Sequence, residues 1–176
     1  MEVHRVEVAP NGTFSIPIEL AFPQEMIVDY KARLFVYANP GDSIYLDFNG
    51  AIWKEKKLLK NIKFSGDSQI RNEEWTEFKR TYLTAEDSAV DKAQKEKNFD
   101  DFHEFMLNHK KELEENIAIF ARETEPSVEL IDWLKNKSKL DYSGHIIRYP
   151  TAHAIYNQLK EVEVKLPETY LSLIHI

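Results

Sequence analysis

The chain contains no cysteine and only five glycines in 176 residues. The lack of cysteine excludes a disulfide framework, a thiolate nucleophile and a cysteine-ligated metal, although it leaves the compartment open. Loops that bind phosphate through backbone N–H groups are rich in glycine, and the sequence contains no such glycine-rich motif. There is also no G-x-S-x-G motif and no H-x-x-x-H pair. The sequence therefore predicts a chain without catalytic activity of its own.

Long apolar runs are missing too. No run approaches the roughly 20 residues that a membrane span requires, and Met1 is followed by E-V-H-R rather than by the basic and apolar regions of a signal peptide. Acidic residues outnumber basic ones by 30 to 23, which gives a net charge of -7. Because such a charge repels phosphate backbones and anionic headgroups, we expect neither nucleic acid nor a membrane surface as the partner.

The first third of the chain has the alternation of β-strands. Val6 and Val8 alternate with polar residues, a turn follows at Asn11-Gly12, and the next apolar side chains share one face: Phe14, Ile16, Ile18 and Leu20. This pattern predicts a hairpin around Asn-Gly, with Pro17 indicating an edge strand because proline lacks an N–H donor. We expect the inward residues of this sheet to be buried, namely Phe14, Ile16, Ile18, Leu46 and Phe48.

Further strands are indicated at residues 26–28, 34–37, 44–48 and 62–64. Between the second and third of them, Pro40 and Gly41 suit the two central positions of a type II turn. Residues 34–48 therefore read as two strands joined at a Pro-Gly turn.

From Ser65 onward the apolar period becomes helical. A first helix has one face formed by Trp75, Phe78 and Tyr82, with Asp67 or Ser68 as its N-cap. Residues 83–98 are polar and show no clear stripe, which favours a loop or a helix extension. The clearest helix follows residue 98 and ends near residue 124, with an apolar stripe expected in the core: Phe99, Phe102, Met106, Leu113, Ile117 and Phe120.

The last part of the sequence predicts two more helices. Ser127 is placed to cap a helix that Pro150 should stop, because proline breaks the helical hydrogen-bond ladder. A shorter helix then covers residues 152–162. The sequence ends on apolar residues without a helix-terminating Gly or Pro, so we expect the chain to be a piece of a longer polypeptide.

The order of these pieces resembles one known family. The chain carries G-T-F-S-I-P-I, then L-F-V-Y-A-N-P-G-D-S-I-Y-L-D, then I-K-F-S-G-D-S-Q-I-R-N-E-E-W, and finally R-Y-P-T-A-H and K-L-P-E-T-Y. Together they are similar to the N-terminal region of extracytoplasmic thioredoxin-like proteins (TlpA/ResA-like disulfide reductases) of Bacteroidetes. The resemblance implies an accessory region that precedes a thioredoxin domain with a C-x-x-C site. Since this chain has no cysteine, the family's catalytic residues map onto no position here.

The strongest candidate for a partner site is the run from Trp53 to Lys63, which concentrates five lysines in an acidic protein. Such a stripe could bind an acidic partner, but it also describes the solvated edge of a hairpin, which is the interpretation we favour. The residues singled out for a ligand or partner are Trp53, Lys56, Lys57, Lys60 and Trp75.

Other polar residues have structural explanations. Asp42 and Asp67 are ordinary turn and cap residues. His103, with Asp100 three residues earlier, resembles half of a carboxylate–histidine metal site. His109 lies on another face of the helix, so the remaining ligands would have to come from a different helix. We therefore predict no metal site and no cofactor.

These observations predict an α+β protein with a small antiparallel, sandwich-like sheet over residues 1–66 and helices over residues 67–176, forming one compact unit. The expected role is a non-catalytic accessory region that positions a redox domain or its substrate outside the cytoplasm. The partner would be a protein or a covalently linked thioredoxin-like domain. One alternative is a small-molecule or glycan-binding domain with Trp53, Trp75 or Trp133 in a cleft between sheet and helices. Another is a hydrolase that uses two carboxylates.

Overall fold

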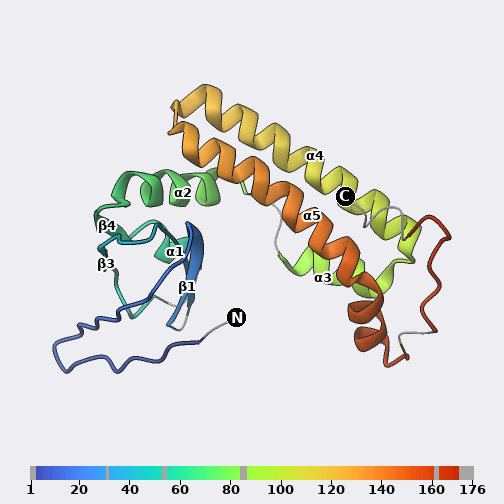
Figure 1. Cartoon of the computed structure of the whole chain (residues 1–176), viewed down its shortest axis with the longest axis horizontal. Helices are drawn as coiled ribbons and strands as arrows, with labels where there is room; N and C mark the ends of the chain where they lie inside the picture. The colour runs from blue at the N-terminus through green and yellow to red at the C-terminus, as the bar shows by residue number, and fades with distance from the viewer. Residues whose placement is uncertain (1–2, 31, 53–54, 84–86, 161–162, 171–176) are drawn as a thin grey trace. The chain divides into compact units, whose positions relative to one another are not determined.

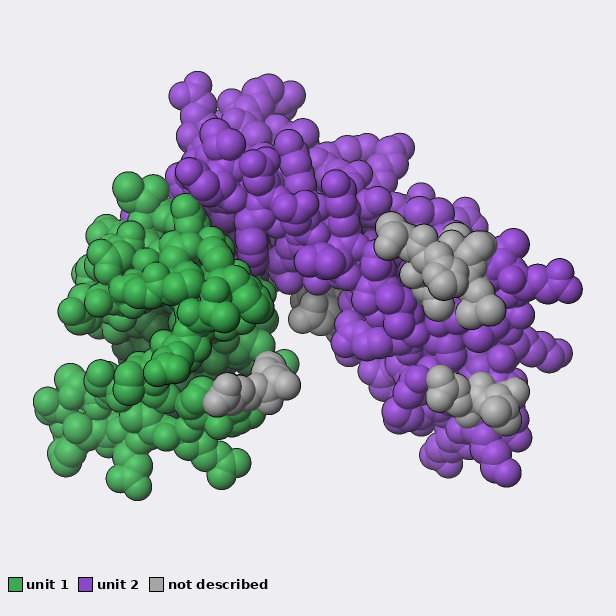
Figure 2. Space-filling model, in the orientation of Figure 1, with its two compact units in different colours: residues 1–72 green, residues 73–176 purple. Residues whose placement is uncertain are grey.

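The protein has an α+β fold, with two small antiparallel sheets followed by helices (Figure 1). This description rests on a computed structural model and covers residues 3–30, 32–52, 55–83, 87–160 and 163–170. The chain divides into two compact units, Met1–Asn72 and Glu73–Ile176, coloured separately in Figure 2. The α+β prediction is thus confirmed. In the part of the chain that is described, no helix is both long enough and apolar enough to cross a membrane.

The N-terminal unit contains four short strands and one turn of helix. β1 (Gln24–Tyr30) pairs with β2 (Ala32–Ala38), β3 (Ile44–Asp47) pairs with β4 (Lys63–Gly66), and α1 (Glu55–Leu58) precedes β4. A small core joins the first sheet to α1 and consists of Leu34, Leu58 and Leu59, with half-buried Val28, Phe48, Ile52 and Ile62 packed against it. The core of this unit thus combines a residue of β2 with residues at the end of α1.

The turn between β2 and β3 has the predicted type II geometry. The N–H of Asp42 donates to the carbonyl of Asn39 at 3.2 Å, and Gly41 has a φ of 87°, which favours glycine. The two strands that this turn joins lie in different sheets, however, since β2 pairs with β1 and β3 with β4. The turn therefore passes the chain from one sheet to the other.

The hairpin predicted around Asn11-Gly12 is wrong. The turn itself forms, with the N–H of Gly12 donating to the carbonyl of Ala9 at 2.8 Å, but the described residues before β1 contain no strand. Ile18 is 38% exposed, and the other predicted sheet-core residues are half-buried: Phe14, Ile16, Leu46 and Phe48. Alternation selects an inward face only where a neighbouring strand supplies backbone partners, and no described strand pairs with this segment.

In the described residues, four helices follow the sheets: α2 (Gln69–Thr81), α3 (Asp87–Glu96), α4 (Phe99–Thr124) and α5 (Val128–Asn157). The long helices α4 and α5 are joined by three residues, so they form an antiparallel hairpin. One core cluster lies near this connection and holds Trp75, Phe78, Ile117, Phe120, Leu130 and Leu134. A second lies toward the other end and holds Val90, Ala93, Phe99, Phe102, Met106, Ile146, Tyr149 and Tyr170.

The predicted helix after residue 98 is confirmed at both ends. Asn98 caps α4 by accepting the N–H of Asp101 at 3.0 Å, and Glu125 ends it in the left-handed conformation just before Pro126. Five members of its predicted stripe are buried, whereas Leu113 is half-buried against the first cluster.

Helix α3 occupies the stretch for which the sequence favoured a loop or a helix extension. Its Val90 and Ala93 are buried, and side chains of α5 bind the carbonyls at its C-terminal end. Tyr149 donates to the carbonyl of Lys97 at 2.7 Å, and His153 Nδ1 lies 2.8 Å from the carbonyl of Gln94. Because a carbonyl only accepts, this nitrogen carries the proton. These tertiary hydrogen bonds therefore add to the burial of Val90 and Ala93 in stabilising α3.

Helix α5 continues through Pro150, so the predicted stop at this residue is wrong. Pro150 is buried within the helix, where it supplies no N–H to the backbone ladder. In the same turn, the hydroxyl of Tyr170 donates to the carbonyl of Ile147 at 3.0 Å. Burial of Pro150 in the helical unit offsets part of the cost of the hydrogen bond that proline removes.

Candidate functional site

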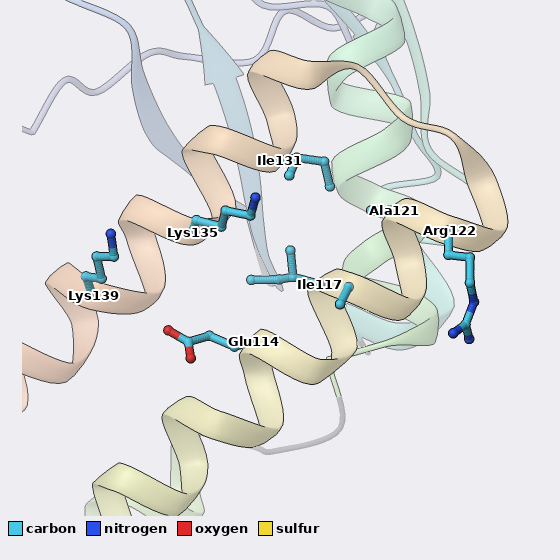
Figure 3. A pocket seen from close by; sticks show the side chains of 8 residues that line it. Glu114, Ile117, Ala121, Arg122, Ile131, Lys135 and Lys139 are labelled. Carbon is cyan, nitrogen blue, oxygen red and sulfur yellow. The ribbon is translucent and has the colours of Figure 1, made fainter.

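A groove of about 640 Å³ runs along the surface between α4 and α5 (Figure 3). Apolar residues form its floor, and charged residues from both helices form its rim. The floor consists of Ile117, Ala118, Ala121 and Ile131, and the rim of Glu114, Arg122, Lys135 and Lys139. Both helices belong to the same compact unit, so the groove is a feature of this unit alone.

The depth of the groove follows from side-chain size. Ala118 and Ala121 project from α4 three residues apart, which places them on neighbouring positions of one helical face. Their methyl groups leave open the space that larger side chains would fill. Ile117, by contrast, is almost fully buried and also belongs to the core cluster near the connection. Packing of Ile117 in this core cluster therefore fixes the position of the groove floor.

The rim is mainly basic in a chain whose net charge is -7. Lys135 and Lys139 lie four residues apart on α5, and neither makes an ion pair with a residue that the structure describes. Glu114, the single rim carboxylate, lies 3.8 Å from Lys110 Nζ, and Arg122 lies 3.8 Å from Glu123. The two lysines thus place positive charge beside an apolar surface, beyond ion-pair distance of any described carboxylate.

A second polar cluster surrounds the Pro-Gly turn of the N-terminal unit. The carboxylate of Asp42 accepts the backbone N–H of Asn39 at 2.8 Å, its side-chain amide at 3.2 Å, and the hydroxyl of Ser68. Partial burial raises the pKa of this carboxyl, but the hydrogen bonds from Ser68 and Asn39 and the charge of Arg71 outweigh it, so the pKa lies below 3.8. Asp42 therefore holds the turn against the start of α2.

Asp67 has a similar structural role. Its carboxylate accepts the N–H of Ser43 at 2.8 Å, and its own N–H donates to the carbonyl of Ser43 at 3.1 Å. Ser68, the other predicted cap of α2, uses its hydroxyl on Asp42 instead. Asp42 thus satisfies neighbouring donors at its turn, as predicted, whereas the carboxylate of Asp67 binds Ser43 instead of capping α2 as predicted.

The histidines of α4 bind aromatic partners. His103 Nε2 lies 2.7 Å from the hydroxyl of Tyr142, and burial raises the pKa of that hydroxyl. His109 stacks on Phe105, with the ring centroids 6.2 Å apart. Within the described ranges, no group of three or more His, Asp or Glu side chains is arranged to hold a metal ion.

The residues predicted for a ligand or partner do not form one surface in the described part of the chain. Lys57 and Lys60 are exposed at α1, whereas Trp53 and the side chain of Lys56 lie outside the described residues. Trp75 is 3% exposed and packs edge-on against Trp133, with 5.0 Å between the ring centroids. Its ring belongs to the core of the helical unit and presents no surface for a ligand.

The sequence reasoning missed the groove. One signal was available, since Ile131, Lys135 and Lys139 are spaced by four and so share a helical face. The facing residues on α4 could not be assigned, because the alignment of the two helices depends on how their cores interlock.

Comparison with known proteins identifies no relative of this chain. No protein-family model matches the chain, and no curated protein or solved structure is significantly similar to it. The resemblance to the accessory region of thioredoxin-like proteins therefore stays a prediction, supported by the quoted motifs alone.

Proposed function

We propose that this chain is a non-catalytic interaction module that binds a protein partner in the groove between α4 and α5. The groove carries the proposal because it combines an open apolar floor with a charged rim on a rigid helix pair. Interfaces commonly have this arrangement, with an apolar centre that supplies affinity and a polar rim that supplies selectivity.

The motif resemblance supports a more specific role within this proposal. The chain would act as the accessory region of an extracytoplasmic thioredoxin-like protein and position the redox domain or its substrate. The chain has no thiol, so any disulfide chemistry would come from the other domain.

A role without catalysis also agrees with how the acidic side chains are used. Asp42 and Asp67 accept hydrogen bonds that hold turns, and Glu74 binds Ser127. Of the tryptophans named for the glycan-binding alternative, Trp75 lies in the core, Trp133 packs edge-on against it, and Trp53 lies outside the described residues.

Calorimetric titration with a purified TlpA/ResA-like thioredoxin domain, its two active-site cysteines replaced by serine, tests the proposal. Ala118→Trp fills the groove at an exposed position, and Ala89→Trp is the matched control at an exposed position of α3. We expect the wild type and the control to bind equally and the groove variant to bind at least about tenfold more weakly, or about 1.4 kcal/mol. Equal binding by all three proteins would exclude the groove, and no binding by any of them would exclude this partner.

A further inference from the structure

The groove's shape and charge indicate what kind of segment it accepts. We propose that its occupant is an acidic amphipathic helix of a partner protein, which packs its apolar face on the groove floor and directs carboxylates to Lys135 and Lys139. This inference rests on the proposed function, because it specifies the partner of the same site.

The shape of the groove favours a helix. A furrow between two antiparallel helices is the position that a third helix takes in a bundle, where side-chain ridges of one helix fill the grooves of its neighbours. Every lining residue comes from α4 or α5, so no other helix in the described part of the chain fills this position. Ala118 and Ala121 would let an incoming backbone approach closely, while Ile117 and Ile131 would contact its apolar side chains.

The charge of the rim favours acidic residues on that helix. Two lysines at positions i and i+4 repel one another, which slightly destabilises a helix. Lys135 and Lys139 have this spacing without an ion-pair partner among the described residues. Two carboxylates one turn apart on an incoming helix would remove the repulsion and form charge-assisted hydrogen bonds. Glu114, the one rim carboxylate, lies within ion-pair distance of Lys110.

A polyanion fits the site less well. The net charge of -7 repels nucleic acid and anionic lipid over the whole molecule, whereas an acidic helix needs only a few carboxylates at the rim. A polyphosphate chain also offers no apolar face for the isoleucine and alanine side chains of the floor. The apolar floor and the basic rim together match a protein helix.

Three fluorescent helical peptides test this inference. They share one set of apolar positions and carry Glu, Gln or Lys at the polar positions, and their binding is measured by anisotropy at low and high salt. The protein variants are Lys135→Glu/Lys139→Glu and, as a control with the same charge change, Lys57→Glu/Lys60→Glu. Far-UV circular dichroism and the denaturation midpoint verify that both variants are folded.

We expect the acidic peptide to bind the wild type at least about tenfold more tightly than the neutral one, with an advantage that salt reduces. The groove variant should lose this preference and favour the basic peptide, while the control variant behaves as the wild type. Equal binding of acidic and neutral peptides would overturn the charge inference and leave the groove as the site. Failure of all three peptides would instead contradict the proposed function.

Two further probes exclude a polyanion as the occupant. Vesicles of phosphatidylserine and phosphatidylcholine, and a duplex DNA oligonucleotide, are titrated with the same proteins. We expect no binding of either. Tight binding of one probe that disappears in the Lys135→Glu/Lys139→Glu variant would overturn the assignment of a protein helix.

Discussion

Both carboxylate oxygens of Glu74 bind Ser127: Oε1 accepts the backbone N–H at 3.0 Å, and Oε2 accepts the hydroxyl at 2.6 Å. The contact ties α2 to the residue that opens α5, where helical N–H groups lack partners within the helix. We expect Glu74→Ala to lower the free energy of unfolding by about 1–3 kcal/mol, because two donors lose their acceptor. Glu74→Gln keeps one acceptor oxygen and should cost less. Urea denaturation measures both, and equal midpoints for wild type and Glu74→Ala would refute the contact.

The core of the helical unit gives a second prediction. Phe102 is fully buried and stacks on Tyr149, with the ring centroids 4.9 Å apart. Phe102→Ala should cost roughly 3–5 kcal/mol through lost burial and the cavity left behind. Leu140→Ala is the control, since Leu140 is 71% exposed and should change stability by less than about 0.5 kcal/mol. A denaturation midpoint that is unchanged for Phe102→Ala would show that the residue lies outside the core.

Two glycines of the N-terminal unit, Gly41 and Gly66, allow a controlled comparison. Gly41 and Gly66 both have positive φ angles, of 87° and 97°, but a Cβ at Gly41 would enter open space, whereas one at Gly66 would lie 2.0 Å from the carbonyl oxygen of Ser43. Gly41→Ala should cost about 1–2 kcal/mol from backbone strain alone. Gly66→Ala should cost clearly more, because the end of β4 must also move away from Ser43. Equal melting temperatures for the two variants would contradict this close approach.

The lowered pKa of Asp42 predicts a pH dependence. A carboxyl whose pKa is lower in the folded protein than in the unfolded chain stabilises the fold above the unfolded value of about 3.9. This contribution is lost as the pH falls through the folded pKa. Asp42→Asn should therefore be less stable than the wild type at pH 7, with a difference that shrinks as the pH falls below about 4. Guanidinium denaturation at several pH values measures it, and a constant difference down to pH 2 would count against the assignment.

Helix α4 shows what the sequence could predict well. Its apolar stripe keeps one face from Phe99 to Phe120, about six turns, and Asn98 and Pro126 mark the ends of the helix. Local residues decide such a helix, so its bounds follow from the chain alone. The β1 and β2 strands were likewise predicted from short apolar runs, although their partners were not.

The errors arose where tertiary contacts decide the structure. Residues 14–20 alternate like a strand but have no described strand to pair with. Helix α3 has only a short apolar face, Val90 and Ala93, and Tyr149 and His153 bind carbonyls at or just after its C-terminal end. Pro150 lies within α5 because the surrounding core buries it. The groove was not predicted for the same reason. Which residues of α4 lie opposite which residues of α5 depends on packing between side chains that are distant in the sequence.

The central claim is that the α4–α5 groove is an interaction site. Its most direct test is paramagnetic relaxation enhancement, measured by NMR. The acidic peptide carries a nitroxide at its centre, and the loss of signal at each backbone amide of the ¹⁵N-labelled protein reports how close it binds. We predict the strongest loss at Ala118, Ala121 and Lys135, with the amide of Ala89 on α3 unaffected. Bound peptide that broadens the amides of Lys57 and Lys60 most strongly, and leaves those of the groove sharp, would contradict the claim.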